Sequence, residues 1–436
     1  MRMLLPSEAT EPPGARGVPE KTVVRGVPEK TVALRGMPDT SGSFTLSKPW
    51  RPAWAEVDLN AVRHNVGLLA RLVSPAGLMA VVKADGYGHG SVAAAYAALE
   101  AGATWLGVAL VEEGVELREA GVDVPILLLS QPPVEAARAV VDAGLTPVVH
   151  SRRFVDALAK AAADAGAVDP QPVHLKVDTG MHRIGCSPSE ALDLAPAIRK
   201  HRELHLQGLL THFAVADEPD NPYTARQVAT FEAVRKELAR LGIRPPLIHA
   251  ANSAAVLTAP DTHYDLVRCG IAIYGIAPAS ELDGLLPLKP ALSLKARISY
   301  VRRLVAGERL SYGLRYELDV ASTVVTVPVG YADGVPRRLG EVGGEVLIAG
   351  RRRPIAGTVT MDQLLVDLGP SDGNAAAGVD VGTEVVLLGR QGDARGGGGV
   401  SPQEEITAAE WAARLGTIPY EVCCGIGDRV PRRYLG

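Results

Sequence analysis

Between residues 79 and 269, short apolar runs alternate eight times with longer amphipathic segments. Each run has the length of a buried strand, and the segments between them are rich in Ala, Leu, Glu and Arg and end near Gly, as helices do. This alternation is what a (β/α)8 TIM barrel requires, so we predict an α/β fold of that kind. The predicted strands are 79–82, 105–109, 126–130, 147–150, 173–177, 206–210, 247–249 and 266–269, and the helical segments include 91–101, 112–120, 133–143, 154–166, 188–200 and 223–241.

The periodicity changes after about residue 294. The later apolar runs are separated by Gly, Pro and Asp, which is typical of a predominantly β domain. We therefore place the barrel at 51–294 and a C-terminal β domain at 295–436. The arginines at 351–353 are expected at a solvated hairpin tip, and the glycine-rich stretch 391–401 is expected to be a flexible insertion. The expected strands are 323–329, 345–348, 363–368 and 384–388.

The first fifty residues form a separate segment. The octapeptide RGVPEKTV occurs at 16–23 and again at 25–32, and a degenerate third copy opens at Arg35. The repeat is rich in Pro, Gly and charge, and each unit is too short to bury a core, so we predict a disordered tail over 1–50. A docking tail is one alternative. Another is that translation begins at Met37.

Composition excludes some classes of partner. The net charge of −4 supplies no electrostatic reason to expect nucleic acid or an anionic membrane. No stretch is long and apolar enough to cross a bilayer. The four cysteines show neither metal-ligand spacing nor a disulfide framework, so we expect no metal and a reducing, cytoplasmic location.

Lys83 is the first candidate for chemistry. It stands where the apolar run 79–82 meets a glycine-rich loop, in VVKADGYGHG. An amine held at a strand end and partly desolvated has a lowered pKa, so it can attack a carbonyl and form a Schiff base. Tyr87, four residues on, could support a ligand phosphate. From this segment alone a simply solvated lysine remains the alternative.

The motif containing Lys83 resembles the cofactor-lysine signature of the alanine racemases, a family of enzymes that use pyridoxal phosphate (PLP). The resemblance extends from about Trp54 to the C-terminus and follows the family's order. It implies a barrel followed by a β domain, paired head to tail in a homodimer whose active sites each use both subunits. The further matching motifs are KVDTGMHRIG, THFAVAD, HAANSAA, RCGIAIYG, SYGLRY, GYADGVPRR, TMDQ and IPYE.

The resemblance implies two bases, because racemisation removes the α-proton from one face and delivers one to the other. Lys83 matches the residue that holds PLP and serves D-alanine, and Tyr312 matches the base that serves L-alanine. His212 and Arg268 complete a relay with Tyr312. Arg268 also points at the PLP pyridine nitrogen, and an arginine cannot accept a proton from it.

The remaining expected contacts also come from the resemblance. Lys176 matches a lysine that is carbamylated in many relatives, and Thr360 replaces a cysteine often found before the methionine of TMDQ. The phosphate contacts are Tyr87, Ser253, the backbone N–H groups of Gly270 and Ile271, and Tyr420. The substrate-binding residues are Arg183, Met361, Lys176, and Tyr274 and Tyr331 at the mouth of the site.

The implied activity is the interconversion of L-alanine and D-alanine, which supplies D-alanine for peptidoglycan. A racemase of wider specificity, acting on serine or other amino acids, is an alternative. Decarboxylases share the two-domain plan, but Arg268 and the Tyr312 motif do not suit them. A PLP carrier built from a barrel alone would leave the C-terminal domain unexplained. Taken singly, each of these residues also has an ordinary structural interpretation, as core or surface packing.

Overall fold

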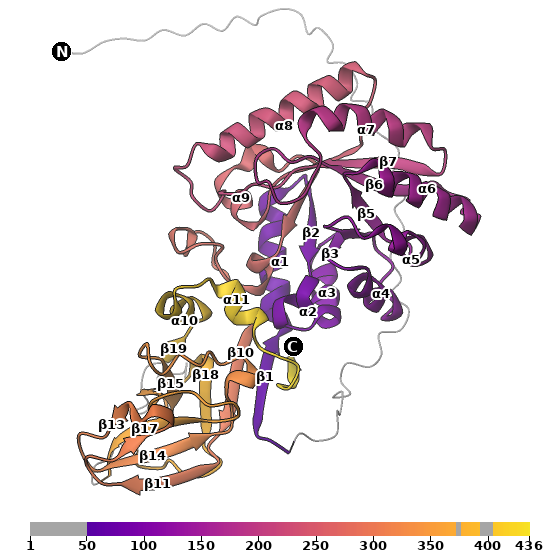
Figure 1. The fold of residues 1–436 in the computed structure, drawn as a ribbon. Coiled ribbons are helices and arrows are strands. Elements are labelled where there is room, and N and C mark those ends of the chain that lie inside the picture. The colour runs from indigo at the N-terminus through magenta and orange to yellow at the C-terminus, as the bar shows by residue number, and fades with distance from the viewer. Residues whose placement is uncertain (1–49, 372–375, 393–403) are drawn as a thin grey trace, which may run out of the picture. The chain divides into compact units, whose positions relative to one another are not determined.

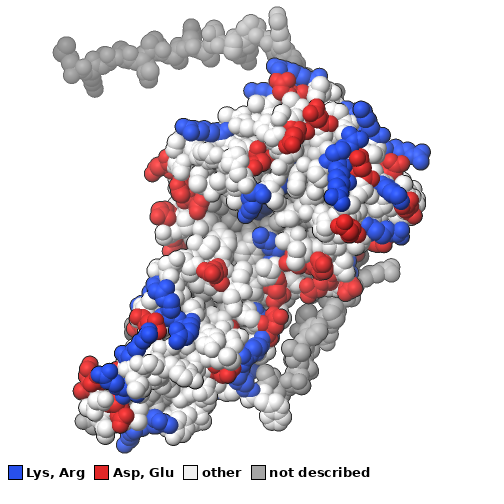
Figure 2. Space-filling view, in the orientation of Figure 1, with Lys and Arg blue, Asp and Glu red and all other residues white. Residues whose placement is uncertain are grey.

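The computed structural model describes residues 50–371, 376–392 and 404–436. The predicted tail, except Trp50, and most of the predicted insertion at 391–401 lie outside these ranges. The described chain contains a barrel and a β domain (Figure 1). Basic and acidic side chains are interspersed over the face that Figure 2 shows. Within the described ranges, no helix combines the length and the apolar character needed to cross a bilayer.

The barrel consists of eight parallel strands in the order β8-β7-β6-β5-β4-β3-β2-β9, so the first barrel strand pairs with the last. A parallel bridge between Asn252, which follows β8, and Arg268 of β9 nearly closes the ring. The TIM barrel prediction is confirmed, with every predicted strand present. The strands are β2 (Gly77–Val81), β3 (Trp105–Val108), β4 (Ile126–Leu128), β5 (Thr146–Val149), β6 (Gln171–Lys176), β7 (Leu204–Leu210), β8 (Leu247–His249) and β9 (Leu266–Cys269).

Four of the barrel helices described here begin at a residue whose side chain caps the helix. In α6 the Ser151 hydroxyl accepts a hydrogen bond from Phe154 N, and Gly166 ends the helix in the left-handed region. Phe154 and Leu158 of the same helix are buried in the core. The helices are α1 (Leu59–Val73), α2 (Lys83–Gly88), α3 (Ser91–Glu100), α4 (Val111–Glu119), α5 (Ala137–Asp142), α6 (Arg152–Ala165), α7 (Pro188–Lys200), α8 (Tyr223–Arg240) and α9 (Ser253–Thr258).

The β domain contains a seven-stranded sheet with the order β16-β15-β18-β10-β1-β20, to which β19 adds beside β18. A second sheet has the order β11-β14-β17, and β12 pairs with β13. The predicted strands of this domain are all present. The elements are β10 (Leu292–Arg297), β11 (Tyr300–Leu304), β12 (Arg309–Leu310), β13 (Tyr316–Glu317), β14 (Ser322–Val327), β15 (Glu345–Ile348), β16 (Arg351–Pro354), β17 (Leu364–Pro370), β18 (Glu384–Gln391), β19 (Glu404–Ile406), α10 (Ala408–Leu415), α11 (Pro419–Cys424) and β20 (Arg432–Leu435).

Two features differ from the sequence predictions. Strand β1 (Ala53–Asp58) pairs antiparallel with β10 and parallel with β20, so the chain enters the β sheet before it enters the barrel, unlike the predicted boundary at residue 51. The arginines at 351–353 do not form a solvated tip, and that expectation was wrong. They lie in β16, where Arg352 forms ion pairs with Glu345, Glu404 and Glu410.

Candidate active site

Lys83 opens a turn with an unusual backbone. Ala84, Asp85, Gly86 and Tyr87 all have φ between 49° and 61°, in the left-handed region. Three of these residues carry a Cβ, and each of the three costs about 1–2 kcal/mol in this conformation, so the surrounding contacts must hold the turn.

Several side chains supply those contacts. The Asp85 carboxylate accepts a hydrogen bond from Ser91 N across 2.9 Å. The ring of His89 is buried, and its Nδ1 lies 3.0 Å from the carbonyl oxygen of Gly86 and 3.0 Å from that of Tyr87. Glu113 accepts from Ala84 N across 2.7 Å and from Ala109 N across 2.7 Å, which ties the start of the turn to the next strand end. The turn therefore places Lys83 and Tyr87 together.

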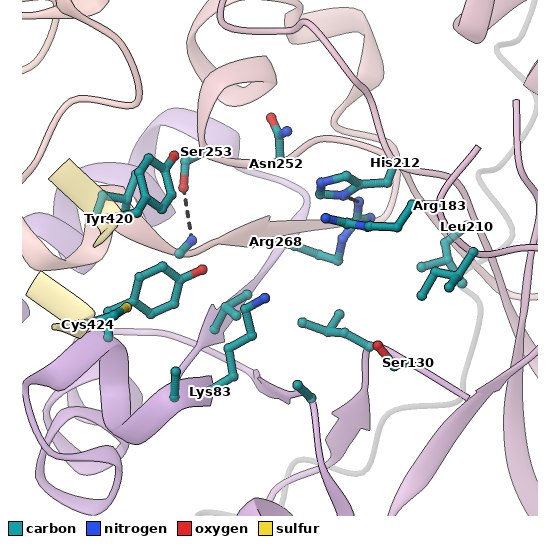
Figure 3. A pocket seen from close by; sticks show the side chains of 18 of the residues that line it. Lys83, Ser130, Arg183, Leu210, His212, Asn252, Ser253, Arg268, Tyr420 and Cys424 are labelled. Atoms are coloured by element: carbon teal, nitrogen blue, oxygen red, sulfur yellow. Dashed lines mark hydrogen bonds between the residues drawn. The ribbon is translucent and has the colours of Figure 1, made fainter. Parts of the chain in front are cut away.

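Both residues line a cavity of about 600 Å³ at the carboxyl ends of the barrel strands (Figure 3). Lys176 ends β6, His212 follows β7, and Arg268 lies within β9. Polar groups distant in sequence therefore meet because parallel strands end at the same rim. The predicted residues in the lining are Lys83, Tyr87, Lys176, Arg183, His212, Ser253, Arg268, Gly270, Ile271 and Tyr420.

Two lysine amines in the cavity have lowered pKa values. Burial lowers the pKa of Lys83, and the nearby Arg183 lowers it further. Burial, followed by Arg268, lowers the pKa of Lys176 to about 7. The Lys176 ammonium group donates to the carbonyl of Leu129 across 3.0 Å. A substantial fraction of Lys176 is therefore neutral at physiological pH.

Arg268 is buried, and its guanidinium group contacts two histidines and two backbone carbonyls. Its Nη2 donates to the carbonyls of Thr211 at 2.9 Å and Ala250 at 2.8 Å, and lies 3.1 Å from Nδ1 of His212. Its Nη1 lies 3.2 Å from Nδ1 of His249. Arginine only donates hydrogen bonds, so both Nδ1 atoms must accept them, and each neutral ring carries its proton on Nε2.

Two further hydrogen bonds lie behind Arg268, and in each of them Nε2 of a histidine is the donor. Nε2 of His249 lies 2.9 Å from Nδ1 of His174, and Nε2 of His174 lies 3.2 Å from Oε1 of Gln207. Since the amide oxygen of Gln207 only accepts, His174 donates to it and accepts from His249. Burial lowers the pKa of His174 to about 4 and that of His249 well below its usual range, so both rings are neutral.

The other end of the cavity presents uncharged donors. Gly270 N donates to Ser253 Oγ across 2.9 Å, as the dashed line in Figure 3 marks. A Cβ on Gly270 would lie 2.4 Å from the Tyr87 hydroxyl, so only glycine permits this approach. Burial raises the pKa of Tyr87, and it raises the pKa of Tyr420 to about 12. Both hydroxyls therefore keep their protons, and this donor set fits a phosphate group.

Tyr312, Tyr331 and Met361 lie outside this cavity. Their exposed fractions are 71%, 41% and 52%. Thr358 Oγ1 donates to the carbonyl of Tyr312, and Tyr331 N donates to the carbonyl of Thr360, so these contacts bring the three residues to one part of the β domain. We refer to Tyr312, Tyr331 and Met361 as the Tyr312 surface.

Tyr274 does not lie at the mouth of the site, and that expectation was wrong. The residue is 0% exposed, and its hydroxyl donates to the carbonyl of Val81 across 3.1 Å. Its ring stacks on His89 with the centroids 4.3 Å apart. It ends the short helix η3 (Ile271–Tyr274), which turns it into the core beneath the Lys83 turn.

Some residues of the site were not predicted. Asn252, Ser130 and Cys424 line the cavity, and His174 and His249 support Arg268 from behind. The available signal for the two histidines was their place on predicted strands, where a fully buried polar ring needs a partner. Among the described residues, no group of three or more His, Cys, Asp or Glu side chains is placed to hold a metal ion.

The fold is that of a TIM barrel with an additional β domain, and the cavity at the barrel rim contains a partly desolvated lysine. The family model of the alanine racemase N-terminal domain matches residues 57–278, and that of the C-terminal domain matches 291–434. The chain therefore belongs to the alanine racemase family.

Three relatives illustrate the match. The alanine racemase of Symbiobacterium thermophilum is 48% identical over 386 residues, which cover 88% of this chain and 98% of the relative. The crystal structure of the Bacillus anthracis alanine racemase, with bound L-Ala-P, is 37% identical, covers 89% of this chain and 96% of that one, and has a TM-score of 0.80. The Bartonella henselae alanine racemase, with covalently bound pyridoxal phosphate, is 28% identical, covers 88% and 99%, and has a TM-score of 0.76.

Proposed function

We propose that the protein is a PLP-dependent alanine racemase that interconverts L-alanine and D-alanine by a two-base mechanism. The observation that carries this proposal is the meeting of Lys83 with the His212–Arg268 pair in one cavity. Family membership supports the same activity.

The residues present fit PLP. When bound, PLP supplies the electron sink that makes the α-proton of an amino acid removable. Lys83 would hold it covalently, and Arg268 would face its pyridine nitrogen without giving up a proton. The relative from Bartonella henselae, with covalently bound pyridoxal phosphate, supports this assignment. The phosphate would contact Tyr87, Ser253, Tyr420 and the backbone N–H groups of Gly270 and Ile271.

The two bases would act on opposite faces of the substrate. Lys83 suits one face because its lowered pKa leaves more of the amine neutral and able to accept a proton. Tyr312 is proposed for the other face. The N–H at Nε2 of His212 would then hydrogen-bond to the Tyr312 oxygen, and this would stabilise the negative charge of the phenolate until it accepts the α-proton of the substrate.

We propose a homodimer because the Tyr312 surface lies outside the cavity of its own chain. In a two-fold dimer, each β domain can present Tyr312 and Met361 to the partner's cavity, and the contact is reciprocal. Each active site would then contain Lys83 from one chain and Tyr312 from the other. Tyr331 would border the entrance to the site.

Alanine is the proposed substrate, with Arg183 near its carboxylate and the Met361 backbone N–H beside it. The relative from Bacillus anthracis, with bound L-Ala-P, supports a small ligand of this kind. We propose that Lys176 is carbamylated: its neutral amine would bond to the carbon of CO2 and release a proton, and the new carboxylate would orient Arg183. We also infer a cytoplasmic location, which the four free cysteines support, and a role in supplying D-alanine for peptidoglycan.

A chiral assay tests the function. Purified protein with added PLP should convert L-alanine to D-alanine and the reverse, and should act more slowly on the other members of a panel of L-amino acids. Faster turnover of L-serine would instead indicate a racemase of wider specificity. Release of CO2 and an amine would indicate a decarboxylase, and no reaction with any member would contradict the proposal.

A further inference from the structure

We propose that Arg432, the first residue of β20, is a positioning residue that clamps the left-handed turn bearing Lys83 and Tyr87. The proposal rests on the proposed function only in assigning PLP to that turn. The clamp itself consists of hydrogen bonds from the Arg432 side chain to backbone carbonyls, and these do not involve PLP.

Within the described part of the chain, every hydrogen bond of the Arg432 guanidinium goes to a backbone carbonyl. Its Nε reaches Gly88, the last residue of the turn, across 3.1 Å. Nη1 reaches Gly427 at 2.7 Å and Val430 at 2.8 Å, and Nη2 reaches Ile426 at 2.5 Å. One side chain therefore joins the end of the turn to the segment after α11. A lysine, with a single nitrogen, cannot reach this spread of acceptors.

The C-terminal segment also packs directly against the turn. A Cβ on Gly88 would lie 2.4 Å from the carbonyl oxygen of Cys423, and a Cβ on Gly90 would lie 1.9 Å from the hydroxyl of Tyr434. The backbone of the turn thus touches α11 at one glycine and β20 at the other. Helix α11 carries Tyr420 and Cys424 into the cavity, so the two sides of this contact share the active site.

Arg432 is itself anchored in the β domain. It pairs with Ala55 in the parallel β1–β20 ladder, and Ala55 N donates to the carbonyl of Pro431 across 3.0 Å. A backbone of positive φ at Ala84, Asp85 and Tyr87 persists only where the surroundings restrain it. Arg432 supplies such a restraint because it is held in the β1–β20 ladder. Its loss should allow Lys83 and Tyr87 to move together, which would weaken both the covalent link to the cofactor and the phosphate contact.

The test compares Arg432→Met with Arg433→Met. Arg433 is the matched control, because it is the next residue of β20 and its guanidinium lies over the Trp54 ring, 4.3 Å from the centroid. Hydrogen–deuterium exchange is measured on both variants and the wild type after PLP has been removed. In Arg432→Met the amides of 83–90 should exchange about tenfold faster, the factor expected from losing one hydrogen bond from a charged donor. Arg433→Met should match the wild type.

A PLP titration supplies the second measurement. The dissociation constant of PLP, followed by the absorbance of the bound cofactor, should rise about tenfold in Arg432→Met and in Arg432→Lys, and should not change in Arg433→Met. Unchanged exchange over 83–90 in Arg432→Met overturns the proposal, even if activity falls. Amide exchange that accelerates equally in β10 and β18 also overturns the proposal, because Arg432 would then only stabilise the fold as a whole. If the wild type binds no PLP, the proposed function fails, while the exchange comparison still decides the clamp.

Discussion

Nη2 of Arg268 lies 3.1 Å from Nδ1 of His212, and this contact determines where His212 carries its proton. Arginine cannot accept a hydrogen bond, so Nδ1 accepts and the proton is on Nε2. Burial, followed by the charge of Arg268, holds the pKa of His212 well below its usual range. The ring is therefore neutral and offers an N–H donor, the group that the proposed role of Tyr312 requires.

Lys83→Ala should abolish racemisation in both directions, by at least about 10³-fold, because the cofactor anchor and one base are lost together. Borohydride treatment of the wild type with PLP should label Lys83, as identified by peptide mapping. Lys160→Ala is the control, since that side chain is 77% exposed and pairs with Asp164. A label on any lysine other than Lys83 would contradict the assignment.

Tyr312→Phe should lower racemisation by about 10²–10⁴-fold, the usual contribution of a general base. The loss should affect proton transfer on only one face of the substrate. Exchange of the α-hydrogen of D-alanine into deuterated solvent, measured by NMR, should survive better than exchange from L-alanine because Lys83 is intact. Equal loss for the two enantiomers would refute the one-face role.

Mixing two inactive variants should restore activity if the active site is shared. In a heterodimer of Lys83→Ala with Tyr312→Ala, one site carries both lesions, while the other combines intact Lys83 from one chain with intact Tyr312 from its partner. Co-expressed heterodimers, separated by two different affinity tags, should therefore regain up to about half of the wild-type activity. Heterodimers as inactive as their parents would end the shared-site proposal.

Lys176 should make stability depend on pH. Its pKa is lowered from 10.5 to about 7 in the folded protein, so between these values the unfolded chain binds more protons. The free energy of unfolding should therefore rise with pH across this window, by at most about 1.4 kcal/mol per pH unit, relative to Lys176→Met. Chemical denaturation of both proteins in CO2-free buffer, between about pH 7 and pH 9, measures the difference. A difference that is flat or falls with pH would contradict the folded-state pKa.

The barrel could be predicted because each of its strands is a local apolar run followed by a helical segment. The strand β1 could not, because its pairing partners β10 and β20 lie more than two hundred residues away. Lys83, Arg183, His212 and Arg268, which the motifs named as site residues, all line one cavity. The motifs misplaced Tyr274, because a motif does not specify whether a side chain points toward a cavity or into the core.

The sequence by itself therefore determined the two-domain plan, the family and most of the residues that meet at the barrel rim. These follow from periodicity and from motifs whose information is local. Only the tertiary structure decided the left-handed turn at Lys83, the protonated nitrogens of His212 and His249, and the contact of Arg432 with Gly88. Each of these depends on groups that are far apart in the chain, and their distances and burial exist only after the chain has folded.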